Sequence, residues 1–235
     1  MRLVCLPHAG GASSYFHPVS ATLAPAVEVL AVQYPGRQER LREPCVDTVA
    51  GLADAVAAEL ALYGGSDERD LALFGHSLGG SVGFELARRL EASGRPVAAL
   101  FASGRRSPTA PRDEHDHLLD DEAFLAVIKR LGGSDPRVFE DVEIRELVMP
   151  ALRGDYKAAE NYRYTPGPPL ACPVHVMVGT EDDRVTGPEA AAWAEVTEGG
   201  MTLHRFPGGH FYLNEQVPRV LDVIRRALGV GAFPG

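Results

Sequence analysis

Short apolar runs alternate with helical patterns along most of this chain, and that alternation is the strongest constraint on its fold. Most of these runs place apolar residues at consecutive positions, as strands buried on both faces of a sheet do. The runs lie at residues 2–7, 27–33, 70–74, 97–103, 173–179 and 201–206. Strands that alternate with helices form βαβ units. We therefore predict an α/β fold with a mostly parallel central sheet flanked by helices.

One segment departs from this rhythm. Between about residues 105 and 169 the sequence contains no convincing strand, and helices fit instead at about 120–131, 139–147 and 151–163. Stretches rich in loop-forming residues bound the segment on both sides. We expect a single domain over residues 1–235, with a lid insertion at about 105–169 near the carboxyl edge of the sheet. A helical decoration without functional motion is the alternative interpretation.

Composition excludes several classes of function. The net charge of −9 argues against a nucleic-acid partner, because neutralising phosphates requires a basic face. No run approaches the roughly 18 apolar residues of a membrane-spanning helix, and no signal peptide is recognisable. Three widely spaced cysteines fit a reducing compartment and show no metal-site spacing. We expect a cytoplasmic protein with no membrane association, no metal and no cofactor.

A serine lies between two glycines where the third apolar run gives way to a helical pattern. The surrounding sequence is DLALFGHSLGGSVGFELARRL (residues 70–90), and GHSLG (residues 75–79) matches Gly-x-Ser-x-Gly. The five-residue pattern alone also fits an ordinary tight turn. A strand before it and a helix after it are the context of a nucleophile elbow. We therefore predict that Ser77 is a catalytic nucleophile.

A nucleophilic serine needs a base and an acid, which follow it in the chain order Ser, Asp or Glu, then His in this class of fold. His210 follows the last apolar run in a loop at the carboxyl end of the sheet, where active sites of open α/β sheets lie. Before it, VMVGTEDDRV (residues 176–185) offers acidic residues at another strand end. A short turn after this strand favours Asp182 as the acid, with Asp183 as the second choice.

An oxyanion hole would complete the site. One donor is expected to be the backbone N–H of Leu78, the residue after the nucleophile. The second is expected from the loop after the first run, PHAGGASS, where Ala9 is the first choice and Gly10 the second. Each such donor contributes roughly 10²–10³ in rate. His8 and His76 flank the site, and packing or hydrogen bonding is a more natural role for them than direct chemistry.

Longer stretches of the chain carry a family resemblance. They are LVCLPHAGGASSYF, AVQYPGRQERL, ALFGHSLGGSVGFELARRL, VMPALRGDYKAAENYRY, VMVGTEDDRVTGPEAAAWAE and RFPGGHFYLNE. The chain resembles the type II thioesterases, the free-standing thioesterases of polyketide and nonribosomal-peptide assembly lines, from about residue 2 to residue 228. PHAGG, YPGR and GGHFYL are far more specific to this family than the serine motif.

The resemblance implies an α/β-hydrolase fold and an activity. The expected reaction is hydrolysis of acyl groups, often aberrant ones, from the phosphopantetheine arm of an acyl or peptidyl carrier protein, through an acyl-enzyme. It implies a triad of Ser77, Asp182 and His210, which are also the residues chosen above. The helical insertion at about 105–169 would be the family's lid over the acyl channel.

The partner and the reaction class leave alternatives. Carrier proteins are usually acidic, so docking onto a chain of net charge −9 would need a local basic patch. Two arginine clusters are candidates, with solvated surface charge as the alternative: Arg37, Arg40 and Arg42, and Arg105, Arg106 and Arg112. The same fold could instead serve a carboxylesterase, or an acyltransferase or cyclase. A non-catalytic carrier-binding protein is disfavoured, since binding alone has no need of a complete triad.

Overall fold

Parallel strands form one sheet at the centre of the molecule. The computed structural model describes residues 1–64, 70–133 and 139–231. Within them the strand order is β2-β1-β3-β4-β5-β6, and every paired strand is parallel. The strands are β1 (Arg2–Leu6), β2 (Glu28–Ala31), β3 (Leu71–His76), β4 (Val97–Ser103), β5 (Val174–Gly179) and β6 (Met201–Phe206). All six predicted runs are therefore strands, and the predicted α/β fold class is confirmed.

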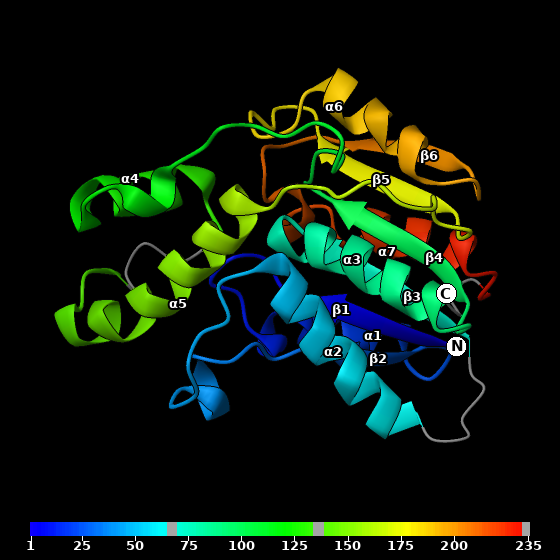
Figure 1. Cartoon of the computed structure of the whole chain (residues 1–235), viewed down its shortest axis with the longest axis horizontal. Helices are drawn as coiled ribbons and strands as arrows, with labels where there is room; N and C mark the ends of the chain where they lie inside the picture. The colour runs from blue at the N-terminus through cyan, green and yellow to red at the C-terminus, as the bar shows by residue number, and fades with distance from the viewer. Residues whose placement is uncertain (65–69, 134–138, 232–235) are drawn as a thin grey trace.

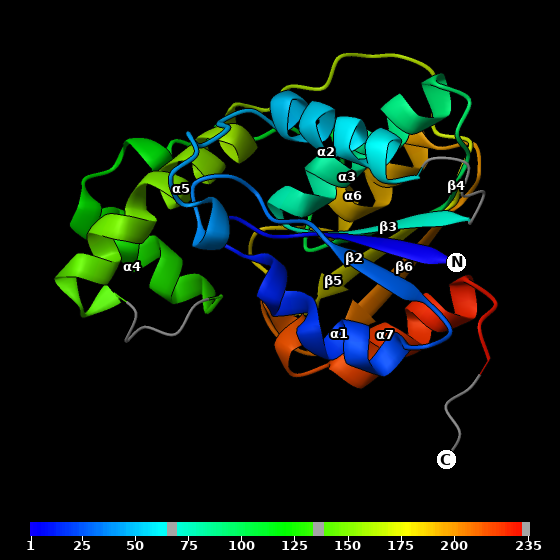
Figure 2. The same cartoon turned by 90° about the horizontal axis from the view of Figure 1, so that it is seen from below.

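Helices cover both faces of the sheet. Figure 2 shows α2, α3 and α6 on one face and α1 and α7 on the other. Their bounds are α1 (His17–Leu23), α2 (Val49–Gly64), α3 (Leu78–Ala92), α6 (Gly187–Ala191) and α7 (Val217–Ala227). Right-handed crossovers between parallel strands need such helices, and the helices in turn bury the apolar faces of the strands.

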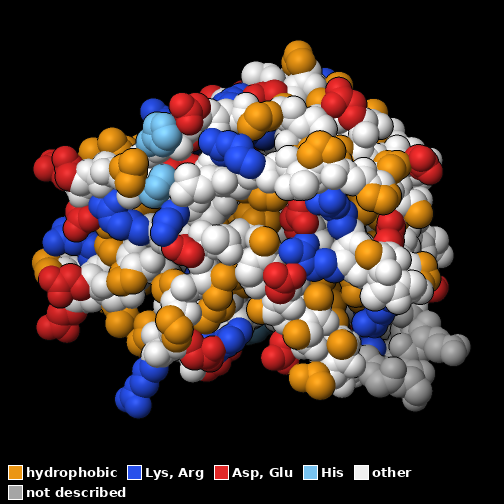
Figure 3. Space-filling view, in the orientation of Figure 1, with side chains coloured by type: hydrophobic (Ala, Val, Ile, Leu, Met, Phe, Trp, Pro, Cys, Tyr) orange, Lys and Arg blue, Asp and Glu red, His pale blue; other side chains and the backbone are white. Residues whose placement is uncertain are grey.

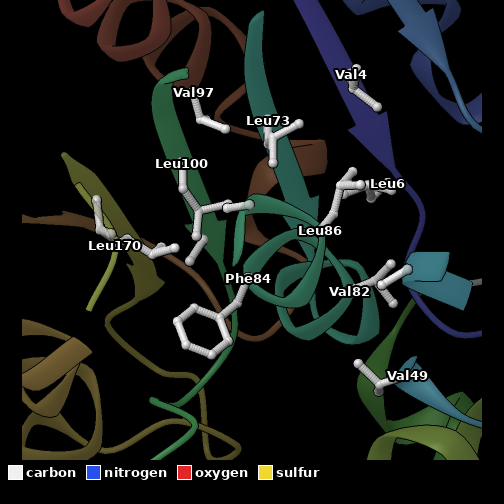
Figure 4. Close-up of a cluster of buried hydrophobic side chains, with 14 of the residues drawn as sticks. Val4, Leu6, Val49, Leu73, Val82, Phe84, Leu86, Val97, Leu100 and Leu170 are labelled. Carbon is white, nitrogen blue, oxygen red and sulfur yellow. The ribbon is translucent and has the colours of Figure 1, made fainter. Parts of the chain in front are cut away.

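The core divides into two clusters, one on each face of the sheet. Successive side chains of a strand point to opposite faces, so Val4 and Leu6 of β1 join one cluster while Leu3 and Cys5 join the other. Figure 4 shows the first cluster, in which side chains of α3 such as Leu86 pack against the strands. Full burial of each aliphatic side chain contributes about 1.5–3 kcal/mol, so the sheet forms a rigid base for the loops at its carboxyl edge.

The insertion between β4 and β5 is helical, as predicted, but its division into helices differs. The predicted helix at about 120–131 is α4 (Asp121–Leu131), whereas the two helices predicted beyond it are one, α5 (Val142–Asn161). Pro150 lies inside α5. An interior proline costs a helix about 3 kcal/mol, and burial of Met149, Ala151 and Leu152 next to Pro150 opposes that cost. The predicted single domain (1–235) and the predicted lid insertion (105–169) each include some residues that lie outside the described ranges.

The insertion has a hydrophobic cluster of its own. In Figure 1, α4 and the first half of α5 project beyond one end of the sheet, while the second half of α5 approaches α3. Asp120 caps α4 and Asp141 caps α5, each accepting a hydrogen bond from a backbone N–H of the first turn. The buried members of the cluster are Phe124, Leu125, Ile128, Phe139, Met149 and Leu152.

No helix among the described residues combines the length and the apolar character needed to cross a membrane.

Candidate active site

Ser77 lies on a strained turn between β3 and α3. Its φ of 54° and ψ of −116° are rare for a residue with a side chain. The turn requires its two flanking glycines: a Cβ on Gly75 would lie 2.0 Å from the carbonyl oxygen of Gly79, and one on Gly79 would lie 2.1 Å from that of Leu6. The Ser77 N–H donates to the carbonyl of Ser103 at 2.8 Å. The Gly-x-Ser-x-Gly motif therefore forms the strand–turn–helix geometry of a nucleophile elbow.

Ser77 lines a cavity at the carboxyl edge of the sheet. Two further groups of residues share its wall, one from the loops after the strands and one from the helical insertion. They include His8, Ala9, His210 and Phe211 from the first group and Leu131, Tyr156, Ala159 and Glu160 from the second. The structure thus brings Ser77 and His210, which are 133 positions apart in the sequence, to one cavity beneath α4 and α5.

His210 pairs with Asp182. The Nδ1 of His210 lies 2.9 Å from Oδ2 of Asp182 and 3.1 Å from Oδ1, and the two side chains are 5% and 0% exposed. Oδ1 of Asp182 also accepts the backbone N–H of Arg184 at 2.9 Å. Glu181 and Asp183, the neighbouring acidic residues, are exposed. The turn after β5 therefore directs the middle one of three consecutive carboxylates toward the imidazole.

The loop after β1 forms a tight turn beside the same cavity. The Gly11 N–H donates to the carbonyl of His8 at 2.9 Å, and Ala9 in the middle of this turn lines the cavity. The Gly10 N–H donates to a carboxylate oxygen of Asp155 at 2.7 Å and so has a partner already. Leu78 is fully buried as the first residue of α3. Of the two residues considered in the loop, Ala9 is the one whose N–H this turn leaves for a ligand.

A buried, hydrogen-bonded serine–histidine pair lies next to the cavity, and no local sequence pattern predicts it. Oγ of Ser103 is 2.9 Å from Nδ1 of His76 and 2.6 Å from the hydroxyl of Tyr212. Ser103 and His76 are both fully buried, and neither lines the cavity. The His76 ring is 5.0 Å from that of His210, centroid to centroid. This chain of hydrogen bonds supports the floor of the site, whereas Ser77 faces the cavity.

The buried histidines around the site are held neutral. Burial, together with the smaller effects of the neighbouring charges of His210 and Arg37, lowers the pKa of His8 to about 3. Burial likewise lowers the pKa of His76 well below its usual value, with smaller contributions from His210 and His8. Neutral rings at these two positions avoid placing additional positive charge beside His210.

His8 makes folding stability sensitive to acid. Its folded pKa of about 3 lies below the unfolded value of 6.5, so between these limits the unfolded chain binds a proton that the folded chain does not. Stability is therefore lost as the pH falls, and between pH 7 and pH 5 the loss from this one group is about 2 kcal/mol. Urea unfolding across this range should show a shallower pH slope for His8→Gln than for wild type. Identical slopes would contradict the assignment.

The first arginine cluster is not a free basic patch. Arg37 is buried and forms two hydrogen bonds with the carboxylate of Asp155, of 2.6 and 2.9 Å. Arg40 forms an ion pair with Glu43. Arg42 is exposed. The prediction of a docking patch at these three residues is therefore wrong, because the burial of Arg37 depends on a partner that is distant in the sequence.

The second arginine cluster also points inward. Arg105 and Arg106 are buried or nearly so, Arg106 pairs with Glu114 at 2.6 Å, and Arg112 pairs with Glu189 at 2.6 Å. Figure 3 shows blue and red side chains interspersed over the visible face of the molecule. The prediction of a basic patch here is wrong as well. Among the described residues, no group of three or more His, Cys, Asp or Glu side chains is arranged to hold a metal ion.

Comparison with known proteins identifies the family. The model of the family described as "Thioesterase domain" matches residues 1–228. Thioesterase PikA5 of Streptomyces venezuelae is 51% identical over 217 residues, covering 92% of this chain and 76% of that protein. The type II thioesterase BorB of the borrelidin cluster is 43% identical with a TM-score of 0.87, covering 97% of this chain and 91% of that one.

A third relative comes from a mixed assembly line. The solved structure of YbtT, a type II thioesterase from the yersiniabactin NRPS/PKS pathway, is 30% identical with a TM-score of 0.87, covering 96% of this chain and 92% of that one. Sequence and fold agree over nearly the whole chain in each comparison. The chain therefore belongs to the thioesterase family and is a type II thioesterase of polyketide and nonribosomal-peptide pathways.

Proposed function

We propose that this thioesterase hydrolyses acyl groups from the phosphopantetheine arm of acyl or peptidyl carrier proteins, with Ser77, His210 and Asp182 as its catalytic triad. The observation that carries the proposal is the buried His210–Asp182 hydrogen bond, whose imidazole shares a cavity with the strained Ser77. An acid, a base and a nucleophile in this relation are the machinery of acyl transfer through a serine ester.

Acylation is the first half of the reaction. Asp182 accepts a hydrogen bond from the Nδ1–H of His210, so Nε2 on the opposite side of the ring is left as the base. Nε2 takes the Ser77 proton as Oγ attacks the thioester carbonyl carbon. The carbonyl π electrons move to oxygen, and the N–H groups of Ala9 and Leu78 stabilise that charge. Collapse breaks the carbon–sulfur bond, and the departing pantetheine thiolate takes the proton from Nε2 of His210, which returns the imidazole to its neutral form.

Deacylation repeats these steps with water. Water replaces the departed thiol and gives a proton to Nε2 of His210 as its oxygen attacks the ester carbonyl. The same two N–H groups stabilise the second tetrahedral intermediate. Its collapse breaks the bond to Oγ, returns the proton to Ser77 and releases the free acid. Asp182 stabilises the imidazolium that forms in each half of the reaction.

The helical insertion is proposed to act as the lid. The cavity at Ser77 has a volume of only about 60 Å³, whereas pockets that enclose a small-molecule ligand usually measure roughly 300–1,000 Å³. Leu131 at the end of α4 and Tyr156 and Ala159 on α5 form part of its wall. Movement of these helices would therefore admit an acyl chain that the present cavity is too small to hold.

A panel of carrier-bound and simple substrates tests the reaction class. The enzyme is expected to convert an acyl-carrier thioester to free acid and free carrier thiol, and to cleave the matching oxygen ester far more slowly, because a thiolate is the better leaving group. Mass spectrometry of both products is the measurement. Faster cleavage of the oxygen ester would indicate a carboxylesterase, and acyl transfer without free acid would indicate an acyltransferase or cyclase. Failure of a fluorophosphonate to label Ser77 would favour a non-catalytic carrier-binding protein.

A further inference from the structure

A buried ion pair between two residues that lie outside the turn at residues 8–11 forms hydrogen bonds with that turn. Asp155, in the second half of α5, accepts the N–H of Gly10 at 2.7 Å. Arg37, in the loop before the short helix at residues 38–40, donates through Nη1 to the carbonyl of Gly11 at 3.2 Å. Two consecutive residues of the turn are thus bound by the two members of one ion pair. None of the triad residues takes part in it.

The ion pair is closely matched and shielded from water. Nη1 of Arg37 lies 2.6 Å from Oδ2 of Asp155 and Nη2 lies 2.9 Å from Oδ1, with side-chain exposures of 9% and 1%. The guanidinium also donates to the carbonyl of Pro35. A buried ion pair contributes little net stability, because the desolvation of its charges offsets their attraction. The two parallel hydrogen bonds of an arginine–carboxylate pair do, however, fix the positions of the groups that are bonded to it.

The turn has a conformation that this pair can select. The hydrogen bond from Gly11 N–H to the His8 carbonyl closes a four-residue turn, and the φ of +75° at Gly10 is typical of the third residue of a type II turn. Type I and type II turns differ by a flip of the central peptide, here the one that joins Ala9 to Gly10. Acceptance of the Gly10 N–H by Asp155 stabilises one orientation of that peptide over the other.

We propose that Arg37 and Asp155 are positioning residues that hold the turn at residues 8–11 so that the Ala9 N–H stays directed at the developing oxyanion beside Ser77. This inference rests on the proposed role of Ala9 as an oxyanion donor. Since Asp155 belongs to α5, oxyanion stabilisation then depends on the placement of that helix. The carboxylate of Asp155 is the contact through which α5 affects the turn that carries the Ala9 N–H.

Paired substitutions separate positioning from folding. In Arg37→Met/Asp155→Leu the ion pair becomes apolar side chains of similar size, which buried sites tolerate well, and the Gly10 N–H loses its acceptor. In Arg37→Gln/Asp155→Asn the charges disappear but amide hydrogen bonds can still form. Asp47→Asn/Lys157→Gln is the matched control: it removes an exposed ion pair that also holds α5 and does not touch the turn.

Kinetics with a small soluble thioester give the first readout. Arg37→Met/Asp155→Leu is expected to lower kcat about 10- to 100-fold with KM within about threefold of wild type, because a displaced oxyanion donor loses part of its 10²–10³ contribution. Arg37→Gln/Asp155→Asn should recover most of that loss, and the Asp47/Lys157 control should match wild type. If Arg37→Met/Asp155→Leu does not unfold cooperatively and is therefore not properly folded, Asp155→Asn alone is measured instead. The same criterion then applies: kcat should fall while KM stays close to that of wild type.

A transition-state analogue gives the second readout. Ser77 adds to a trifluoromethyl ketone to form a hemiketal whose oxygen occupies the oxyanion hole, and its ionisation is visible by ¹⁹F NMR. The hemiketal should ionise at a higher pH in Arg37→Met/Asp155→Leu than in wild type. Wild-type kcat and an unshifted ¹⁹F titration in this folded variant would overturn the inference. Ser77→Ala is measured in parallel, since its retention of activity would instead refute the proposed function.

Discussion

Replacing Ser77 by alanine is expected to lower kcat for hydrolysis of an acyl-carrier thioester by about 10³-fold or more. Alanine removes the only atom of this residue that can bond to the acyl carbon, and water bound in its place would attack without forming an ester. The turn itself should survive, because alanine also has a single Cβ and Gly75 and Gly79 still provide the space around it. The measurement is single-turnover release of free acid, combined with mass spectrometry of the protein for an acyl adduct.

Ser103 provides the matched control for this experiment. It is hydrogen-bonded to a histidine near the cavity, 2.9 Å from Nδ1 of His76, and it is fully buried. Ser103→Ala should leave the acyl adduct intact and lower the melting temperature, because the buried ring of His76 and the hydroxyl of Tyr212 each lose a partner. Loss of the adduct in Ser103→Ala with an intact adduct in Ser77→Ala would reverse the assignment of nucleophile.

Replacing Asp182 by asparagine is expected to lower kcat by about 10⁴-fold with little change in size or fold. A carboxylate can only accept a hydrogen bond, so it keeps the proton of His210 on Nδ1 and leaves Nε2 free as the base. The amide can donate to Nδ1 instead, which favours the opposite tautomer and places the proton on the nitrogen that must accept one from Ser77. It also cannot balance the charge of the imidazolium.

Asp183→Asn is the control for that substitution. It makes the same chemical change one residue away, on an exposed side chain, and kcat should remain within about twofold of wild type, as is usual for surface substitutions away from special features. The pair of variants is compared by kcat across a range of pH, together with thermal unfolding. Equal losses of activity in the two variants would contradict Asp182 as the residue that orients His210.

Structural features that are determined by residues close together in the sequence could be predicted. Most strands of the sheet are consecutive apolar runs, and helical patterns separate them along the chain, so the α/β class followed from this alternation. The choice of Asp182 rested on the length of the turn after β5, and the structure directs that carboxylate to His210. Ala9 was also preferred to Gly10 from the sequence, and the structure adds a physical reason for that order, since the Gly10 N–H is bonded to Asp155.

Features that depend on distant partners were not predictable. Arg37 and Asp155 are 118 positions apart, and Ser103 and Tyr212 are 109 apart. Local sequence does not distinguish an arginine that has a buried partner from one on a solvated surface, so both arginine clusters remained candidates for a docking patch. The continuity of α5 through Pro150 was missed for a related reason: local propensity predicts a break, and tertiary packing overrides it.

The separate hydrophobic cluster of the insertion has a consequence for altering substrate range. Its members, among them Phe124, Ile128 and Leu152, belong to neither of the two clusters that hold the sheet. Residues of α4 can therefore be exchanged in a library without loosening the scaffold that carries Ser77, since distant sites combine nearly additively. Asp155 marks a limit to that freedom, because its carboxylate binds both Arg37 and the N–H of Gly10 in the turn at residues 8–11.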